Sequence, residues 1–169
     1  MIRHDIPRIE TERLILRAPR ESDFDAFASF GASDRAKWVG GPYSRARSWG
    51  GFLAMFGHWA LRGYGFWMLE TRADAGIAGR VGFARHDGWD EPELGWHIFE
   101  GFEGRGIAFE AARAHAARHL GLNGVISYIA HANTRSRALA ERLGAHIERE
   151  AELLGKPCQI WRHPMIGGA

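Results

Sequence analysis

The stretch that decides the fold runs from Glu93 to Ala111 and reads ELGWHIFEGFEGRGIAFEA. Its first part alternates apolar residues with polar or small ones, which predicts a β-strand over Glu93–Phe99 with different chemistry on its two faces. Glycines then interrupt the chain, and from Ala108 onward the alanines recur with helical spacing. A strand therefore leads through a glycine-rich turn directly into a helix.

The glycine-rich turn has properties that suit an anion. Gly104 and Gly106 allow a ligand to approach the backbone closely, because neither residue carries a side chain. The first turn of the following helix presents unpaired N–H groups at the positive end of the helix dipole, and such groups favour phosphate oxygens. The turn is neither a P-loop nor the dinucleotide fingerprint, since no Gly-Lys-Ser/Thr follows and the spacing is GxxGxG. By itself, the stretch is equally compatible with a tight turn that needs glycine for its geometry alone.

The remaining sequence predicts a mixed arrangement of strands and helices around this unit. Further strands are expected at Arg13–Arg17, Phe66–Thr71, Ile77–Ala84, Val125–Ala130, Ile147–Glu150 and Gln159–His163. Helices are expected after Ser22 and Ser44, which we predict as N-caps, and from Thr134 to Leu143. The resulting order, β-α-α-β-β-β-α-β-α-β-β, is typical of an α+β fold rather than a doubly wound sheet.

Length and composition bound the class of protein. The 169 residues correspond to one domain, predicted to span residues 1–169, and 46% hydrophobic with 25% charged residues is a globular composition. The single cysteine, Cys158, excludes a disulfide framework and any CxxC motif. The longest apolar candidate, Gly51–Leu61, is too short to span a membrane, and Met1–Pro7 lacks the apolar stretch of a signal peptide. We therefore expect a soluble, cytoplasmic protein.

Charge and ligand patterns argue against two classes of partner. The formal net charge is only +2 and the basic residues are scattered, so no basic run predicts binding to nucleic acid. His115 and His119 are four residues apart on an expected helix and could in principle bind a metal. No acidic or cysteine partner accompanies them, and we predict no metal site.

A second informative stretch begins at Asn133 and reads NTRSRALAERLGA. Asn133 is suited to the N-cap of a helix, Leu139 and Leu143 to its buried stripe, and Gly144 to the left-handed position after its end. Taken alone, this pattern describes a capped amphipathic helix.

In this order and at this spacing, the two stretches resemble the GNAT superfamily of acyl-CoA-dependent N-acetyltransferases. The segment GRGIAFEA from Gly104 is similar to the acetyl-CoA motif of that family, Q/R-x-x-G-x-G/A. It is most similar to the version W-G-x-G-x-A-T-E-A of the ribosomal-protein-alanine (RimJ/RimL-type) branch. The segment NxxSxxxxERLG from Asn133 and the opening TERLILR from Thr11 also resemble that branch, so the likeness covers about residues 10 to 163.

The resemblance implies a mixed, strongly twisted central sheet of about seven strands flanked by about four helices. It also implies acetyl-CoA as co-substrate, with its pyrophosphate on backbone N–H groups of the glycine turn. The strand Glu93–Phe99 would diverge from Val125–Ala130 and pair with the amides of the pantetheine arm, which Asn133 would also bind. The implied cofactor-binding residues are Ile98, Phe99, Gly104, Arg105, Gly106, Ile107, Ala108, Phe109 and Asn133.

Three positions depart from the family pattern. Glu103 replaces the Gln or Arg (or Trp) at the head of the first motif, and a carboxylate there is unfavourable for phosphates unless it points away. Phe109 stands where a threonine is usual, and Ala140 where many relatives carry a tyrosine that protonates the departing thiolate.

Two residues are therefore candidate catalytic groups. Glu93 is the candidate base for the amine, since relatives often use a glutamate at the start of this strand; otherwise it is a solvated charge at the strand end. Ser136 is the candidate donor to the thiolate, or else a residue at the helix start. His97, on the same strand face as Glu93, is a second candidate base or a pocket wall, and His131 is a second candidate acid.

The predicted function is transfer of an acetyl group from acetyl-CoA to a primary amine. At about pH 7.5, deprotonation costs ~0.5 kcal/mol for a protein α-amine but ~4 kcal/mol for lysine, so one carboxylate base suits an α-amine better. A small-molecule acceptor (an antibiotic or polyamine), a non-catalytic acyl-CoA sensor and a nucleotide-binding module remain alternatives. The expected partners are acetyl-CoA and the amine, with no nucleic acid and no membrane, in a monomer or homodimer.

Overall fold

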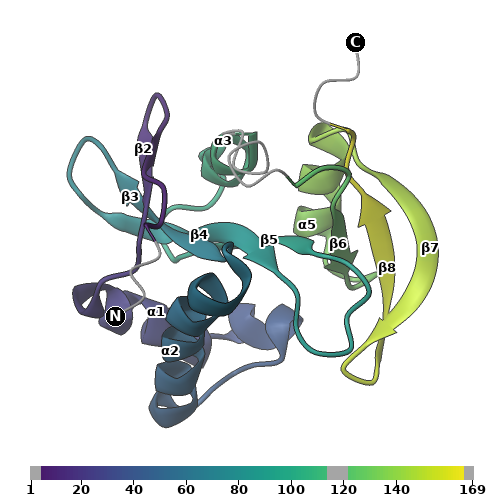
Figure 1. Ribbon diagram of the computed structural model, residues 1–169, viewed down its shortest axis with the longest axis horizontal. Coiled ribbons are helices and arrows are strands. Elements are labelled where there is room, and N and C mark those ends of the chain that lie inside the picture. Colours follow the sequence, from purple (N-terminus) through teal and green to yellow (C-terminus); the bar gives the residue numbers. More distant parts are fainter. Residues whose placement is uncertain (1–4, 114–121, 166–169) are drawn as a thin grey trace.

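One mixed sheet organises the protein (Figure 1), for which the computed structural model describes residues 5–113 and 122–165. Eight strands lie in the spatial order β1-β2-β3-β4-β5-β6-β8-β7. All neighbours are antiparallel except β5 and β6, which run parallel. The strands are β1 (Ile9–Glu10), β2 (Leu14–Arg17), β3 (Phe66–Thr71), β4 (Ile77–Ala84), β5 (Glu93–Ile98), β6 (Ile126–Ile129), β7 (His146–Leu153) and β8 (Lys156–Arg162).

Helices cover both faces of this sheet. Figure 1 shows α1 and α2 on one side of the central strands and α3 on the other, with α5 beside β6. The described helices are α1 (Phe24–Ala32), α2 (Arg45–Arg62), α3 (Ile107–Arg113) and α5 (Thr134–Arg142), with short 3₁₀ helices at Glu21–Asp23 and Asp34–Val39. Only the first part of the predicted helix after the glycine turn belongs to the described residues.

The alternation of side chains along the strands divides the core into two layers. On the α3 face, strands β2 to β5 contribute an apolar layer against Ile107 and Ala111, comprising Leu14, Leu16, Trp67, Leu69, Val81, Phe83 and Leu94. On the opposite face, Met68 and Phe99 pack against aromatic and apolar residues of α1 and α2, namely Phe24, Phe27, Phe52 and Met55. The sheet is therefore clamped between α3 on one side and the α1–α2 pair on the other.

The α+β class and the GNAT-like sheet are confirmed, with eight strands where about seven are predicted. The additional strand, β1, pairs only two residues with β2 and has no sequence pattern of its own. Ser44 is the predicted N-cap and accepts a hydrogen bond from Arg47 N at 3.2 Å. The prediction that Ser22 caps α1 is wrong, because Ser22 lies within a 3₁₀ turn and the cap position belongs to Asp23.

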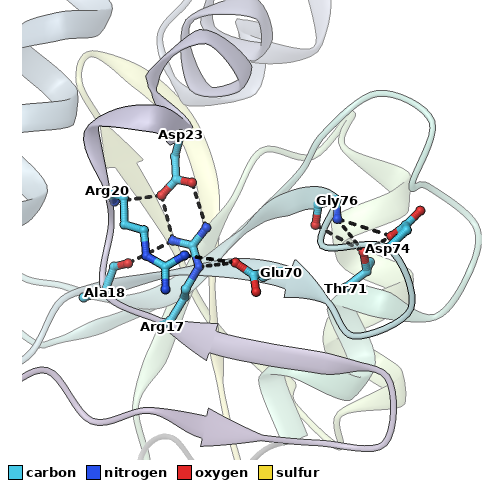
Figure 2. Close-up of polar contacts among 8 residues, drawn as sticks. All are labelled: Arg17, Ala18, Arg20, Asp23, Glu70, Thr71, Asp74 and Gly76. Atoms are coloured by element: carbon cyan, nitrogen blue, oxygen red, sulfur yellow. Dashed lines mark hydrogen bonds and ion pairs between the residues drawn. The ribbon is translucent and has the colours of Figure 1, made fainter.

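The Asp23 carboxylate is instead committed to a buried ion pair (Figure 2). Both of its oxygens accept hydrogen bonds from the Arg17 guanidinium, each at 2.8 Å, and Arg20 N donates to one of them at 2.8 Å. Arg17 Nε also donates to Glu70 at 2.5 Å. The hydrogen bond to Asp23 is the main reason that the pKa of Arg17 is raised. This cluster ties β2 and β3 to the segment that leads into α1.

A second polar cluster in Figure 2 closes the hairpin between β3 and β4, which pair antiparallel. Gly76 N donates to Thr71 Oγ1 at 2.9 Å, and Thr71 N donates to the Gly76 carbonyl at 2.9 Å. The Thr71 hydroxyl also donates to Asp74, and this hydrogen bond lowers the pKa of that carboxyl.

Candidate active site

The parallel pair β5–β6 opens almost as soon as it begins. Its register contains one residue pair, Glu93 with Ile126. In a continuing parallel ladder, the next bond would join Tyr128 N to the Leu94 carbonyl. Instead, the Leu94 carbonyl accepts a hydrogen bond from Ser127 Oγ at 2.6 Å, and Tyr128 N donates to the Glu93 carboxyl at 3.3 Å. Two side chains thus end the ladder, and the strands diverge as the resemblance implies.

A cavity of about 640 Å³ follows this gap. Its walls come from β5, β6, the glycine turn, α3, α5 and the 3₁₀ helix Asp34–Val39. The predicted residues that line it are Glu93, Ile98, Gly104, Gly106, Ile107, Ala108, Phe109, Asn133 and Ser136. The structure therefore brings the two sequence motifs and the candidate catalytic residues to one cavity.

Phe99 and Arg105 are the predicted residues that do not line this cavity. The Phe99 side chain is buried on the α1 face, its N–H donates to the Ala78 carbonyl at 2.9 Å, and its carbonyl accepts from Phe102 N at 3.2 Å. Backbone groups alternate in direction along a strand, so Trp96 and Ile98 direct theirs away from β4 and toward the gap. The backbone groups that face the gap are therefore those of Trp96 and Ile98, and not those of Phe99, which the family resemblance pairs with the pantetheine arm.

The glycine turn has the conformation that only glycine adopts readily. Gly104 and Gly106 have φ values of 72° and 74°, in the left-handed region. A Cβ built on Gly104 would meet no atom within 4 Å, so the space beside the turn is open. The turn is therefore accessible to a ligand, and any side chain there would also strain the backbone.

The opening segment of the chain holds this turn in place. The Glu110 carboxylate on α3 accepts hydrogen bonds from Thr11 Oγ1 at 2.6 Å, Arg13 N at 2.8 Å and Arg13 Nε at 2.6 Å. Arg13 Nη1 also donates to the Arg105 carbonyl at 2.8 Å. In a trans peptide the C=O and the following N–H point in opposite directions, so this bond turns the Gly106 N–H away from Arg13.

Glu103, the unfavourable departure from the family pattern, is paired with another side chain. Its carboxylate lies 2.5 Å from Arg35 Nη1, on the 3₁₀ helix that forms the opposite wall of the cavity. Partial burial raises the pKa of Glu103, but backbone N–H groups and the charge of Arg35 lower it overall, so the carboxylate is ionised at neutral pH. Its charge is therefore neutralised beside the turn.

Glu93 lies at the closed end of the gap. Its single hydrogen bond comes from Tyr128 N, and in the described part of the chain no cation pairs with it. Burial raises the pKa of Glu93 to about 8, an effect that the Tyr128 N–H only partly offsets. A carboxyl with this pKa can accept a proton and also release it near neutral pH.

Ser136 faces the same cavity from the first turn of α5. Asn133 is the N-cap, as predicted, and its Oδ1 accepts from Ser136 N at 3.3 Å. The Trp96 indole N–H donates to Ser136 Oγ at 3.2 Å. With its oxygen already accepting this bond, the Ser136 hydroxyl is left to donate its proton.

The two histidines considered for proton transfer have other surroundings. His131 is exposed, bonds to Glu150 at 2.6 Å and is absent from the cavity wall. His97 lines the cavity, but its Nδ1 accepts a hydrogen bond from Arg80 Nε at 2.8 Å. Burial, and secondarily the charge of Arg80, hold the pKa of His97 well below its usual range. Neither environment is that of a general base or acid.

Two residues that shape this site have no individual signal in the sequence. Arg13 belongs to the recognised TERLILR segment, but its bonds to residues about a hundred positions away depend on the fold. Trp96 occupies the strand face opposite Glu93, and only the position of α5 brings its indole to Ser136.

Two further observations concern metals and membranes. Among residues 5–113 and 122–165, no group of three His, Cys, Asp or Glu side chains is arranged to hold a metal ion. His115 and His119 lie outside the described residues. No helix in these two ranges is both long and apolar enough to cross a membrane.

Comparison with known proteins agrees with this geometry. A sequence model described as "Acetyltransferase (GNAT) domain" matches residues 13–146. The chain is 36% identical to an acetyltransferase from Agrobacterium tumefaciens str. C58, with a TM-score of 0.86 over 96% of this chain and 97% of that chain.

Two solved structures of lower identity share the fold. RimL, a ribosomal L7/L12 alpha-N-protein acetyltransferase in complex with coenzyme A, is 20% identical with a TM-score of 0.75, over 94% of this chain and 98% of that chain. The ribosomal-protein-S5-alanine acetyltransferase from Vibrio fischeri is 16% identical with a TM-score of 0.73, over 96% and 98%. The matched family domain and the 36% identical relative establish the assignment: this chain belongs to the GNAT family of acetyltransferases.

Proposed function

We propose that this acetyltransferase transfers the acetyl group of acetyl-CoA to the N-terminal α-amine of a protein or peptide. The observation that carries the proposal is the position of the Glu93 carboxyl at the closed end of the gap, where burial raises its pKa to about 8. An α-amine has a pKa of ~7.8 and a lysine ~10.4. Proton transfer from an α-amine to Glu93 is therefore nearly balanced in free energy, whereas transfer from lysine is uphill.

The residues around the cavity would divide the work of binding. The N–H groups from Gly104 to Phe109 hold the pyrophosphate, with the Gly106 N–H aimed by Arg13. Backbone groups of Trp96 and Ile98 pair with the amides of the pantetheine arm. The Asn133 side-chain amide, whose oxygen caps α5, keeps its N–H groups for the same arm.

Two side chains would carry the proton movements. As the amine nitrogen attacks the thioester carbon, its proton passes to the Glu93 carboxylate. When the C–S bond breaks, the sulfur leaves as a thiolate whose conjugate thiol has a pKa of ~8.5. The Ser136 hydroxyl donates a hydrogen bond to that thiolate, and solvent supplies the proton that converts it to the thiol.

Two of the similar structures are acetyltransferases of ribosomal proteins, so peptides that copy the N-termini of ribosomal proteins are the first acceptors to test. A single domain over residues 1–169, a cytoplasmic location and a monomer or homodimer belong to the same proposal.

The decisive experiment is an acetyl-CoA turnover screen that follows free thiol and identifies the product by mass spectrometry. Peptides with a free N-terminus are compared with the same peptides blocked at the N-terminus but containing lysine, and with polyamines and aminoglycosides. We expect acetylation of the free α-amine. Preferential acetylation of lysine or of the small amines would replace the proposed acceptor, and CoA binding without thiol release would indicate a sensor.

A further inference from the structure

His97 is held in one orientation by groups on three sides. Its ring stacks between Phe30 of α1, with centroids 5.5 Å apart and planes at 13°, and Phe66 of β3, at 5.7 Å and 23°. Its Nδ1 accepts the hydrogen bond from Arg80 Nε on the neighbouring strand β4. Both faces and one edge of the imidazole are therefore occupied by protein.

Arg80 determines which nitrogen of that imidazole carries the proton. An arginine side chain has only donors, so Nδ1 must present a lone pair and the proton of the neutral ring must be on Nε2. Arg80 itself lies over the rings of Phe27 at 4.9 Å and Phe66 at 4.4 Å, and Nη1 lies 3.2 Å from Met55 Sδ. Burial lowers the pKa of Arg80 to about 10, so it remains a cation at neutral pH.

This cation has no carboxylate partner within the described ranges, because none of the ion pairs there includes Arg80. Its charge is therefore not cancelled by a neighbouring carboxylate, and Arg80 is hydrogen-bonded to His97, which lines the cavity. A positive charge behind an imidazole polarises the N–H on its far side and makes it a stronger donor.

The remaining edge of His97 is accessible. Nε2 makes no hydrogen bond to the described residues, yet it is not among the buried polar atoms that lack a partner. His97 also lines the cavity. With both faces and the Nδ1 edge covered, the Nε2–H is the part of the ring that reaches the cavity.

We propose that the Nε2–H of His97 binds a carbonyl or carboxylate oxygen of the amine acceptor, with Arg80 as the positioning residue that fixes its tautomer. The inference rests on the proposed function and narrows its substrate class. An acceptor with an oxygen is attracted to this donor, whereas a polyamine would bring a second ammonium group toward the unpaired charge of Arg80.

The spacing along β5 favours an extended acceptor. Glu93 and His97 lie on the same strand face four residues apart, which is about 13 Å at ~3.3 Å per residue. An acceptor that places its amine at Glu93 and an oxygen at His97 is therefore longer than one amino acid. The first few residues of a peptide in extended conformation span such a distance, since each adds at most ~3.6 Å.

The test compares His97→Phe with His97→Gln on two acceptors. Phenylalanine keeps the aromatic stack and removes the N–H, whereas glutamine restores a donor near the position of Nε2. The acceptors are a tetrapeptide with a free N-terminus and an alkylamine of similar length without oxygen. We expect His97→Phe to lower the ratio of kcat/KM for the tetrapeptide over the alkylamine about tenfold, as for one lost hydrogen bond. His97→Gln should restore part of that ratio, and the KM for acetyl-CoA should stay within about twofold.

Each other outcome overturns the inference. An unchanged ratio would make His97 a wall of the cavity, and an equal loss of kcat for both acceptors would make it an acid–base group. Wild-type enzyme that acetylates the alkylamine but no peptide would instead contradict the proposed function, before any variant is made. Tetrapeptides with a free or an amidated C-terminus then show whether the oxygen is a carboxylate or a carbonyl.

The role of Arg80 has a separate readout in the nitrogen chemical shifts of the His97 ring. Wild-type protein should show the Nε2–H tautomer alone, and Arg80→Met should show a mixture of tautomers that titrates at higher pH. An Nδ1–H tautomer in the wild type overturns the assignment, and this spectrum needs no variant to fold.

Discussion

The Glu93 carboxyl has a pKa close to that of an α-amine. The residue begins a strand, and its carboxyl replaces a backbone carbonyl at the point where the sheet opens. Burial raises the pKa of this carboxyl to about 8, so it keeps its proton up to about that pH. Its ionised fraction therefore rises steeply over the pH range in which an α-amine also loses its proton.

This ionisation should appear in the pH dependence of turnover. We expect kcat/KM to rise with pH up to about 8, because both Glu93 and the amine must lose a proton. Glu93→Gln should lower kcat/KM at pH 7 by about 10²–10⁴-fold, the usual contribution of a general base. The loss should shrink above pH 9, where solvent supplies neutral amine.

Initial rates from pH 6 to 10 measure this effect, with Glu100→Gln as the matched control at an exposed glutamate on the same segment. A loss below about threefold at every pH would reduce Glu93 to a structural hydrogen-bond acceptor.

Ser136 should contribute less than Glu93. A serine hydroxyl has too high a pKa to be a strong acid, and the thiolate is only moderately basic. Ser136→Ala is expected to lower kcat about tenfold, equivalent to roughly 1.4 kcal/mol, and to leave CoA affinity nearly unchanged. Steady-state kinetics and calorimetric titration with CoA measure the two quantities. Full turnover in this variant would assign Ser136 to capping of α5 alone.

At the scale of elements, the glycine turn and the opening segment act as one unit. A test by Gly106→Val would mix two effects, because a branched side chain at a φ of 74° strains the backbone as well as blocking the ligand. Arg13 offers a cleaner test, since it reaches the turn through the Arg105 carbonyl.

We expect Arg13→Gln to raise the KM for acetyl-CoA about tenfold with little change in kcat, through one weakened charge-assisted interaction. The variant should act like wild type on S-acetylpantetheine, which lacks the phosphates. Arg13→Lys is the control: it keeps the charge but loses the fork geometry, so it should resemble the glutamine variant. Retained affinity in the lysine variant would indicate direct charge attraction instead of positioning.

Much of this element could be predicted from sequence, and the failures have identifiable causes. The strand, turn and helix from Glu93 onward follow from local alternation and glycine spacing. The direction of the backbone N–H and C=O groups does not follow from the sequence. The register of β5 with β4 decides that the backbone groups of Ile98 face the gap, whereas the N–H of Phe99 faces β4. Likewise, Ser22 has a capping side chain, but the cap position of α1 falls on Asp23, whose carboxylate accepts hydrogen bonds from Arg17 on β2.

At the scale of the whole molecule, the buried Arg17–Asp23 pair links the sheet to α1. Both side chains are almost fully enclosed, at 6% and 2% exposure. Asp23→Ala would leave the Arg17 charge without its main partner, so we expect a loss of about 3–5 kcal/mol in the free energy of unfolding. Urea denaturation followed by circular dichroism measures it, with Asp25→Ala on exposed helix surface as control. A loss below about 1 kcal/mol would contradict the assignment.

Stability should also depend on pH through Glu93. Because its pKa in the folded protein is about 8 and its ordinary value 4.5, the folded state binds the proton more tightly than the unfolded chain. The contribution of Glu93 is therefore most favourable below pH 4.5 and is lost as the pH rises toward 8. Glu93→Gln should raise the Tm relative to wild type at pH 9 and not at pH 5, as thermal scans at both values would show. An equal Tm difference at both values would mean that the pKa of the Glu93 carboxyl is not raised in the folded protein.

The early end of the β5–β6 ladder has a consequence for the catalytic cycle. If the pantetheine arm supplies the missing partner for these strand edges, it does so equally for acetyl-CoA before the reaction and for CoA after it. Binding of this kind lowers the free energy of substrate and product complexes alike and does not by itself accelerate the chemical step. We therefore expect CoA to inhibit competitively at concentrations close to the KM of its acetylated form. Any protein that binds a carrier through the part that does not change in the reaction has the same limit on its rate, because the spent carrier must leave before the next loaded one enters.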